Sequence, residues 1–437
     1  MREIFKFKNL NDEIISVDSN QVRILDKKEV LIALKSNMAI LKYISSVLKN
    51  DKDIALEAIK NLTSFNYELF QYLSDRLRSD QEIIGAAVKK VGRVLQYASS
   101  ELKNDRNLVL QALQNDGTAI MYAGVGLKKD KELAREAIKN DPWSLNFIDE
   151  GLRDDEDIVL LAVSKDGEAL KGASGRLRDD LDVVLHAVKN DGEAIQYASD
   201  RLKSDRKVAK VALQNYGFAM QYLDASLRSN KELVMLAVAN QGCSLEMAGA
   251  DLKKDKEVVM KAVSSDGMAL QFADESLKED KEVIRLALMN DPSAIQFLCE
   301  ELRDNKEIVM KGSTYGSRAL EYASLRLRGD KSIVLHAVKN CGWSYHYASE
   351  ELKRDLQIVK EAVKNNGEVL RLVPDCFKKD PDICLHALRS NHLSISYIDE
   401  EVLKNPEARN LIEEILWEFW NKGENVSSRY IPTNVKK

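Results

Sequence analysis

The sequence of 437 residues has few prolines, few cysteines and no long apolar run, and each shortage excludes a class of protein. Only 6 prolines and 20 glycines occur, which fits an ordered helical chain with few strand markers. The 5 cysteines lack a framework spacing, so we expect reduced thiols rather than a disulfide scaffold. No segment has the apolar length of a signal peptide or a membrane span, so we expect a cytoplasmic protein without a membrane partner.

The charge balance also carries little functional signal. The formal net charge is −5, from 65 basic and 70 acidic residues. This value is small for the length, and it gives no reason to expect nucleic acid or an anionic membrane as a bulk partner. The abundant charged residues, 31% of the chain, therefore need a structural explanation.

An acidic or amide residue recurs at intervals of 25 residues along most of the chain. The series runs through Asp80, Asp105, Asp130, Asp155, Asp180, Asp205, Asn230, Asp255, Asp280, Asn305, Asp330, Asp355 and Asp380. Two further units begin at Asp26 and Asp51, and the second is four residues longer than the others. A fixed period of this length is typical of a solenoid whose repeats stack on one another.

Each unit, counted from this residue as position 1, begins with the pattern of a capped amphipathic helix. Asp and Asn are preferred helix N-caps, because their side chains accept a hydrogen bond from an unpaired backbone N–H. Positions 4, 5, 8 and 9 are apolar, as in Val183, Val184, Ala187 and Val188, and they form one buried stripe. Position 8 is Ala in every unit but one, where it is Gly312, which predicts a close approach of neighbouring helices.

Position 13 marks the corner between the two halves of each unit. It is usually Gly, as in Gly92 and Gly192, and in two units Pro142 or Pro292 replaces it. We interpret the Gly as a left-handed helix end and the Pro as the first turn of a second helix. The second half carries small then bulky residues at positions 15 and 16 and an aromatic at position 18. The sequence therefore predicts an all-α solenoid (a superhelix) of about fifteen repeats, each of two helices of about ten residues.

The predicted organisation has three parts. Residues 1–25 have mixed, partly β-like character and are expected to cap one end of the array. Residues 26–404 form the array of helical pairs. Residues 405–437 are expected to form a C-terminal capping helix followed by a flexible tail, because terminal repeats need a cover.

The segment Asp255-Lys-Glu-Val-Val-Met-Lys-Ala-Val-Ser-Ser-Asp-Gly-Met-Ala-Leu-Gln-Phe-Ala resembles the repeat catalogued as domain of unknown function 4116. The resemblance extends over residues 26–404, and it departs from the pattern around residues 62–67, at Gly312 and Gly316, and at Pro374. It implies tandem helical repeats and no assigned activity. Such arrays are typical of host-associated bacteria, protists, algae and large viruses, which favours a host-facing role and leaves delivery into a host cell open.

The sequence motifs favour a protein that is not an enzyme. No nucleophile elbow, phosphate-binding loop or dinucleotide fingerprint occurs, and the recurring carboxylates coincide with helix caps. Cys376, Cys384, His386 and His392 form the densest group of potential metal ligands, but they lack the spacing of a zinc site. We therefore expect no catalytic residue, no cofactor and no metal.

Position 24 is basic in the units up to Lys378, which leaves a nucleic-acid hypothesis open. A row of Lys and Arg along one edge could follow a phosphate backbone. The alternative is that each side chain is solvated at a helix C-terminus, where the helix dipole favours a cation. We favour the second interpretation, and we keep a nucleic-acid-binding solenoid and a structural or self-assembling rod as alternative functions.

Position 14 is the most variable column, and it supplies the candidate binding residues. It is aromatic or sulfur-containing in some units and charged in others, which predicts an exposed position, and position 17 is expected to lie beside it. The candidates for contact with a protein partner are Trp143, Phe218, Met268, Trp343 and His346. The expected function is a non-catalytic scaffold for a protein partner of unknown identity.

The recurring alanine at position 8 leads to a first prediction. Replacement of Ala187 by Leu should lower the free energy of unfolding by roughly 1–3 kcal/mol, because the added carbons overpack a close helix contact. Urea denaturation followed by circular dichroism measures this quantity. An unchanged midpoint would contradict the close packing inferred for position 8.

Overall fold

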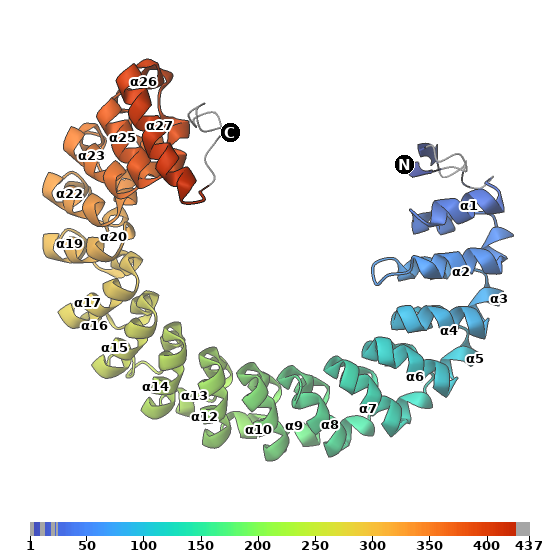
Figure 1. The fold of residues 1–437 in the computed structure, drawn as a ribbon. Coiled ribbons are helices and arrows are strands. Elements are labelled where there is room, and N and C mark those ends of the chain that lie inside the picture. The colour runs from blue at the N-terminus through green and yellow to red at the C-terminus, as the bar shows by residue number, and fades with distance from the viewer. Residues whose placement is uncertain (1–3, 9–13, 19–21, 23–24, 425–437) are drawn as a thin grey trace. The chain divides into compact units, whose positions relative to one another are not determined.

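The computed structural model describes residues 4–8, 14–18, 22 and 25–424, and it divides into two compact units at Asp224. Each unit is a stack of the same repeat, and successive repeats lie side by side along the chain (Figure 1). The predicted all-α solenoid is thereby confirmed for the repeat array. Each unit is described below by itself.

Every repeat begins with an α-helix, and most of these helices are ten residues long. In the first unit they are α1 (Lys27–Leu34), α2 (Lys52–Lys60), α4 (Gln81–Lys90), α6 (Arg106–Asn115), α7 (Lys131–Asn140), α8 (Glu156–Val163), α10 (Leu181–Asn190) and α12 (Arg206–Asn215). In the second unit they are α14 (Lys231–Asn240), α15 (Lys256–Ser265), α17 (Lys281–Asn290), α19 (Lys306–Tyr315), α22 (Lys331–Asn340), α23 (Leu356–Asn365) and α25 (Pro381–Ser390).

The second half of the repeat differs from the predicted ten-residue helix. Its main element is a 3-10 helix, usually six residues long, that begins at position 13. In the first unit these are η2 (Met38–Lys42), η4 (Tyr67–Tyr72), η5 (Gly92–Tyr97), η6 (Gly117–Tyr122), η8 (Pro142–Phe147), η10 (Gly167–Gly172), η11 (Gly192–Tyr197) and η12 (Gly217–Tyr222). In the second unit they are η13 (Gly242–Met247), η14 (Gly267–Phe272), η15 (Pro292–Phe297), η16 (Gly342–Tyr347), η18 (Gly367–Leu372) and η19 (His392–Tyr397), with the short α-helix α20 (Arg318–Glu321) in the repeat that begins at Asn305.

A second short turn completes most repeats after a break at positions 19 and 20. In the first unit these turns are η3 (Leu48–Asn50), α3 (Asp75–Arg78), α5 (Ser100–Lys103), η7 (Leu127–Lys129), η9 (Leu152–Asp154), α9 (Gly175–Arg178) and α11 (Asp200–Lys203). In the second unit they are α13 (Ala225–Arg228), α16 (Glu275–Lys278), α18 (Glu300–Arg303), α21 (Leu325–Arg328), η17 (Leu352–Arg354), α24 (Asp375–Lys378) and α26 (Glu400–Lys404). The backbone at position 19 is extended, as at Ala198, so the predicted second helix is interrupted there.

The two ends of the described chain carry elements of their own. Strands β1 (Ile4–Lys8) and β2 (Ile14–Asp18) pair antiparallel, with Ile4 opposite Asp18. At the other end, α27 (Pro406–Asn421) packs against α25 and η19. The predicted flexible tail lies outside the described residues from 425 onward.

Helix caps at position 1 explain the 25-residue recurrence of Asp. The Asp180 carboxylate accepts hydrogen bonds from the backbone N–H groups of Asp182 and Val183, both at 3.0 Å, and the other first helices are capped by the same position. These caps satisfy donors that a helix start leaves unpaired. The prediction of a structural role for this carboxylate is confirmed.

The caps are also bound to the preceding repeat. A basic residue at position 2 forms an ion pair with the next cap at Lys27–Asp51, Lys52–Asp80, Arg106–Asp130, Lys131–Asp155, Lys231–Asp255, Lys256–Asp280, Lys306–Asp330 and Lys331–Asp355. We call each of these an ion-pair rung. A hydrogen bond from Arg106 lowers the pKa of Asp130 below its ordinary value, so the cap stays charged at neutral pH.

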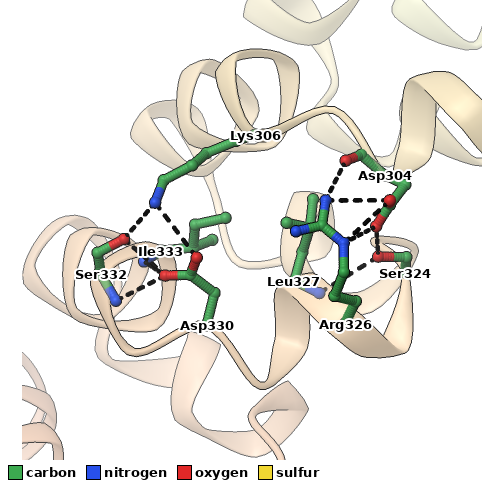
Figure 2. Close-up of polar contacts among 8 residues, drawn as sticks. All are labelled: Asp304, Lys306, Ser324, Arg326, Leu327, Asp330, Ser332 and Ile333. Atoms are coloured by element: carbon green, nitrogen blue, oxygen red, sulfur yellow. Dashed lines mark hydrogen bonds and ion pairs between the residues drawn. The ribbon is translucent and has the colours of Figure 1, made fainter.

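Figure 2 shows one ion-pair rung and, near it, a second polar contact between neighbouring repeats. Lys306 contacts Asp330 at 3.2 Å and the hydroxyl of Ser332 at 2.7 Å. On the neighbouring turn, the Asp304 carboxylate accepts hydrogen bonds from the Ser324 hydroxyl and from Arg326 Nε, and these bonds lower the pKa of Asp304. Both links cross from one repeat to the next.

The glycine at position 13 is required by a close approach and not by a left-handed backbone. A Cβ atom on Gly167 would lie 2.5 Å from the carbonyl oxygen of Ala187 in the next repeat. Among the described glycines only Gly423 has a left-handed φ, so the predicted left-handed helix end at position 13 is wrong. The small residues at positions 8 and 13 of neighbouring repeats instead fit against each other, and Ala187 is fully buried.

An asparagine at position 11 strengthens the same contact. The Asn190 side-chain oxygen accepts the Gly167 N–H at 3.1 Å, and its amide donates to the Ser164 carbonyl at 3.0 Å. One side chain therefore satisfies a donor and an acceptor at the corner of the preceding repeat, where the helix ladder leaves both unpaired.

The close approach predicts opposite effects for two glycines of one repeat. Gly167→Ala should lower the free energy of unfolding by roughly 1–3 kcal/mol, because its Cβ overlaps the Ala187 carbonyl. Gly175→Ala, at an exposed helix start with no atom within 4 Å of the added Cβ, should be neutral or raise it by up to about 1 kcal/mol. Chemical denaturation of both variants measures the difference. Equal effects would contradict the steric explanation.

The cap at Asp330 predicts a dependence of stability on pH. Hydrogen bonds from Ser332, the Ile333 backbone and Lys306 lower the pKa of Asp330 to about 2 from an ordinary value of 3.8. Because the folded-state pKa is depressed, the stabilisation is present above about pH 4 and is lost as the pH falls through about 2.

Asp330→Asn keeps a capping side chain but cannot ionise. Its unfolding free energy should be lower than that of the wild type by about 1 kcal/mol at pH 7, a value reduced for solvent screening, and the gap should close towards pH 2. Thermal unfolding of both proteins from pH 7 to pH 2 tests this. A constant gap across that range would show that the charge of Asp330 does not contribute.

Candidate functional site

The 3-10 helices present one outward-facing set of side chains, at positions 14, 17 and 18, which we call the η face. In a 3-10 helix, side chains three residues apart eclipse each other, so positions 14 and 17 fall into one column. Residues at position 16, such as Leu145 and Ile195, are buried in the core. Positions 14, 17 and 18 are therefore the part of this helix that is left to contact solvent or a partner.

Hydrogen bonds confirm that positions 14 and 17 are neighbours. The side-chain amide at position 17 donates to the backbone carbonyl at position 14 in four repeats: Gln71 to Glu68 at 3.0 Å, Asn146 to Trp143 at 3.0 Å, Gln271 to Met268 at 3.1 Å, and Gln296 to Ser293 at 3.1 Å. The amide thus fixes the side chain at position 17 beside the one at position 14.

The predicted candidates differ in how far they reach solvent. Trp143 on η8 is 37% exposed, and His346 on η16 is also exposed. Phe218 on η12, Met268 on η14 and Trp343 on η16 are half-buried, so the predicted exposure of position 14 holds only in part. The candidates do not gather into one patch, because polar residues occupy position 14 in the repeats between them.

Contacts with the following repeat cover two of the half-buried candidates, Trp343 and Met268. The Arg371 guanidinium lies 4.9 Å from the centre of the Trp343 ring, which is the geometry of a cation–π contact. The sulfur of Met268 lies 3.3 Å from the Ser293 hydroxyl. Because these covering residues lie one repeat further along the chain, the sequence pattern of a single repeat cannot reveal them.

Trp343, His346 and Arg371 form the densest aromatic and basic group of the η face in the second unit. Trp343 and His346 share the eclipsed column of η16, and the His346 ring lies 5.0 Å from that of Tyr347. His346 and Arg371 are both exposed, so the group offers a flat ring and two basic side chains to a partner.

The first unit carries an acidic and aromatic counterpart on η10, η11 and η12. The hydroxyl of Tyr222 donates to Glu193 at 3.1 Å, and Lys171 lies 6.0 Å from the centre of the Tyr197 ring. Partial burial and the nearby carboxylates raise the pKa of Glu168 above its ordinary value. This group is therefore acidic where the Trp343 group is basic.

Two features of this surface were not predicted from the sequence. The aromatic residues at position 18, such as Tyr97 and Tyr122, are half-exposed. The four-residue insertion of the second repeat carries Phe65, which is 98% exposed on a loop held by a hydrogen bond from the Thr63 N–H to the Asn66 side chain at 2.8 Å. Only the insertion itself marked this loop in the sequence.

The basic residues at position 24 point back onto the protein. Lys128 donates to the Met121 carbonyl at 2.7 Å, at the end of η6, and Arg328 donates to the Tyr347 carbonyl at 2.7 Å. Lys278 and Lys353 form ion pairs with Glu275 and Glu350 of their own turns, both at 2.8 Å. The two contacts with backbone carbonyls match the interpretation that the end of a helix stabilises the cation, whereas the expectation of solvated side chains is wrong, because position 24 is half-buried.

The thiol and imidazole groups have structural surroundings. Burial and the hydrogen bond to Asp266 raise the pKa of the Cys243 thiol to about 12, and burial raises that of Cys384 to about 12, so both stay protonated. The His392 ring packs 5.1 Å from Phe419 of α27, whereas Trp420 on the same helix is 45% exposed. Within residues 4–8, 14–18, 22 and 25–424, no group of three or more His, Cys, Asp or Glu side chains could hold a metal ion.

Comparison with known proteins identifies the repeats. None of the helices that the structure describes is long and apolar enough to cross a membrane. No curated protein matches the chain. The profile of a family described as "Domain of unknown function (DUF4116)" matches in overlapping copies across residues 26–353 and again at residues 355–403. Because these matches cover most of the sequence, the chain belongs to the DUF4116 family.

Proposed function

We propose that this chain is a non-catalytic scaffold that binds a protein partner through its η face. The proposal rests on one observation: the η face varies in sequence from repeat to repeat, whereas the columns that hold the repeats together vary less. Positions 14 and 17 vary from Trp to Glu while the frame around them stays the same. A surface that varies on a constant frame is suited to recognition, as in other repeat proteins.

The other columns of the repeat already have structural partners. Position 1 caps the first helix, position 2 binds the next cap, and positions 8 and 13 form the close contact between repeats. Position 11 bridges two backbone groups of the preceding repeat. Residues at positions 14 and 17 can therefore be exchanged without loss of the fold, and this freedom supports their role as the contact surface.

The chemistry of the η face indicates what kind of partner fits. Trp and Tyr are enriched among residues that dominate binding energy, and they act best when polar groups surround them. Trp343 with His346 and Arg371 suits an acidic or aromatic segment of a partner. The Glu193 and Tyr222 group of the first unit suits a basic segment.

The Trp343 group predicts a separation of binding from folding. Trp343→Ala should weaken binding of the partner by about 2 kcal/mol, roughly thirtyfold, as expected for an aromatic anchor. Trp143→Ala should act in the same direction. Both variants should keep the helical circular dichroism spectrum, because neither ring belongs to the fully buried core.

The partner is first identified by capture with the intact chain, from extracts of the native cell and of its host, and mass spectrometry. Titration calorimetry then compares the wild type with both Trp variants. Leu356→Ala is the matched control, since Leu356 is 48% exposed. It occupies position 2 of its repeat, at the start of α23, away from the η face. Unchanged affinity of both Trp variants, or an equal loss in the control, would contradict the proposal.

A further inference from the structure

A cleft of about 250 Å³ opens between α17 and α19 in the second unit. Its floor contains Ile284, Leu288, Leu302 and Ile308, and the exposed Tyr315 lies among its lining residues. The cleft is formed mainly by first helices of two repeats, so it is a separate surface from the η face. It differs in two ways from the repeat interfaces on either side of it.

The ion-pair rung is missing at this interface. At the interfaces on both sides, Lys256 binds Asp280 at 2.9 Å and Lys306 binds Asp330 at 3.2 Å. Between them the cap is Asn305, which carries no charge. The Lys281 side chain, which would form the rung, makes no hydrogen bond or ion pair with the residues that the structure describes, although its charge is close enough to Glu307 to help lower the pKa of that carboxyl. The Arg285 side chain, one helical turn further, likewise has no hydrogen bond or ion pair among the described residues.

The apolar floor is also uncovered here. Ile308 at position 4 is half-buried, whereas its equivalents Val283 and Ile333 in the adjacent repeats are fully buried. A half-buried aliphatic side chain at a position that otherwise belongs to the core indicates that the neighbouring repeat covers it only in part. The cleft is therefore lined by surface that water solvates poorly.

Local departures from the repeat accompany this opening. Pro292 replaces the glycine at position 13, and its ring meets Gly316 of the following repeat, where a Cβ atom would lie 3.2 Å from Pro292 Cγ. In that repeat the 3-10 helix is replaced by α20, which approaches Gly312 so closely that a Cβ there would lie 2.8 Å from that of Ala319. The repeat at Asn305 is thus built differently from its neighbours.

The charges at the rim favour an anion. Lys311 lies 2.7 Å from Glu307, and this contact lowers the pKa of Glu307, so these two lining charges neutralise each other. Lys281, Arg285 and Glu279 remain, with a net charge of +1. Lys281 and Arg285 are four residues apart on α17, so both side chains lie on one face of the helix.

We propose that this cleft binds a free aliphatic carboxylate of medium chain length. The aliphatic chain lies on Ile284, Leu288 and Ile308, and the carboxylate accepts hydrogen bonds from Lys281 and Arg285. An engineered cavity of about 150 Å³ accommodates benzene, so a cleft of this volume suits a chain of roughly eight to ten carbons. Charge-assisted hydrogen bonds at the rim distinguish the acid from an uncharged molecule of the same length.

Octanoate and 1-octanol are the probes for titration calorimetry with the full chain. One octanoate should bind saturably, and 1-octanol should bind about tenfold more weakly, the loss expected when a charge-assisted hydrogen bond is absent. Lys281→Gln and Arg285→Gln should each weaken octanoate binding about tenfold and leave 1-octanol binding unchanged. Asn305→Asp should also weaken octanoate, because it restores the acceptor that Lys281 binds at regular interfaces.

Lys331→Gln is the matched control, since Lys331 occupies the same position at a regular interface and binds Asp355 at 2.6 Å. It should leave octanoate binding unchanged. The absence of saturable binding, equal affinity for octanoate and 1-octanol, or an equal loss in Lys331→Gln and Lys281→Gln would each overturn the proposal. Thermal unfolding of every variant excludes loss of the fold as the cause.

Discussion

The contact between position 13 of one repeat and position 8 of the next governs the rest of the structure. At Gly167 and Ala187 the two backbones approach so closely that the space for one Cβ atom is missing. Such a contact leaves the corner's backbone N–H without a helical partner, and Asn190 supplies the acceptor from the following repeat. Where repeats meet through backbone and short side chains, the distance between them can vary little, because protein interiors are close-packed. The strict 25-residue period follows from this constraint.

The two prolines show what happens when the constraint is altered. Where Pro142 takes position 13, the next first helix, α8, ends at Val163, two residues earlier than a regular repeat. Where Pro292 takes it, the next repeat has Gly316 and the short helix α20. Proline adds a ring at a position where glycine otherwise allows a close approach. In the second case the cap of the altered repeat is Asn305, so the ion-pair rung from Lys281 of the preceding repeat is absent, and a cleft lies at this interface.

The sequence sufficed to predict the features that depend on one repeat alone. The cap at Asp180, the buried stripe of α10 and the terminal helix α27 follow from local propensity and periodicity. The 3-10 helix was missed because six residues cannot distinguish its period from that of an α-helix. The conformation of Gly167 was misjudged because its steric partner belongs to the next repeat. The burial of Trp343 escaped prediction for the same reason, since Arg371 covers it.

Because the surroundings of each residue include the neighbouring repeat, repeats with the same backbone can present different surfaces. A residue on the η face lies beside side chains from the next repeat, as Trp343 does beside Arg371. One substitution at position 14 therefore changes the surface of two repeats, whereas the backbone contacts at positions 8 and 13 stay as they were. The cleft beside α17 arises differently, from the loss of a frame contact between Lys281 and the next cap. The variable columns therefore differ along the array without a change in the frame, and one altered interface carries an open cleft. The same repeat can thus supply an extended surface and a local pocket without a change of fold.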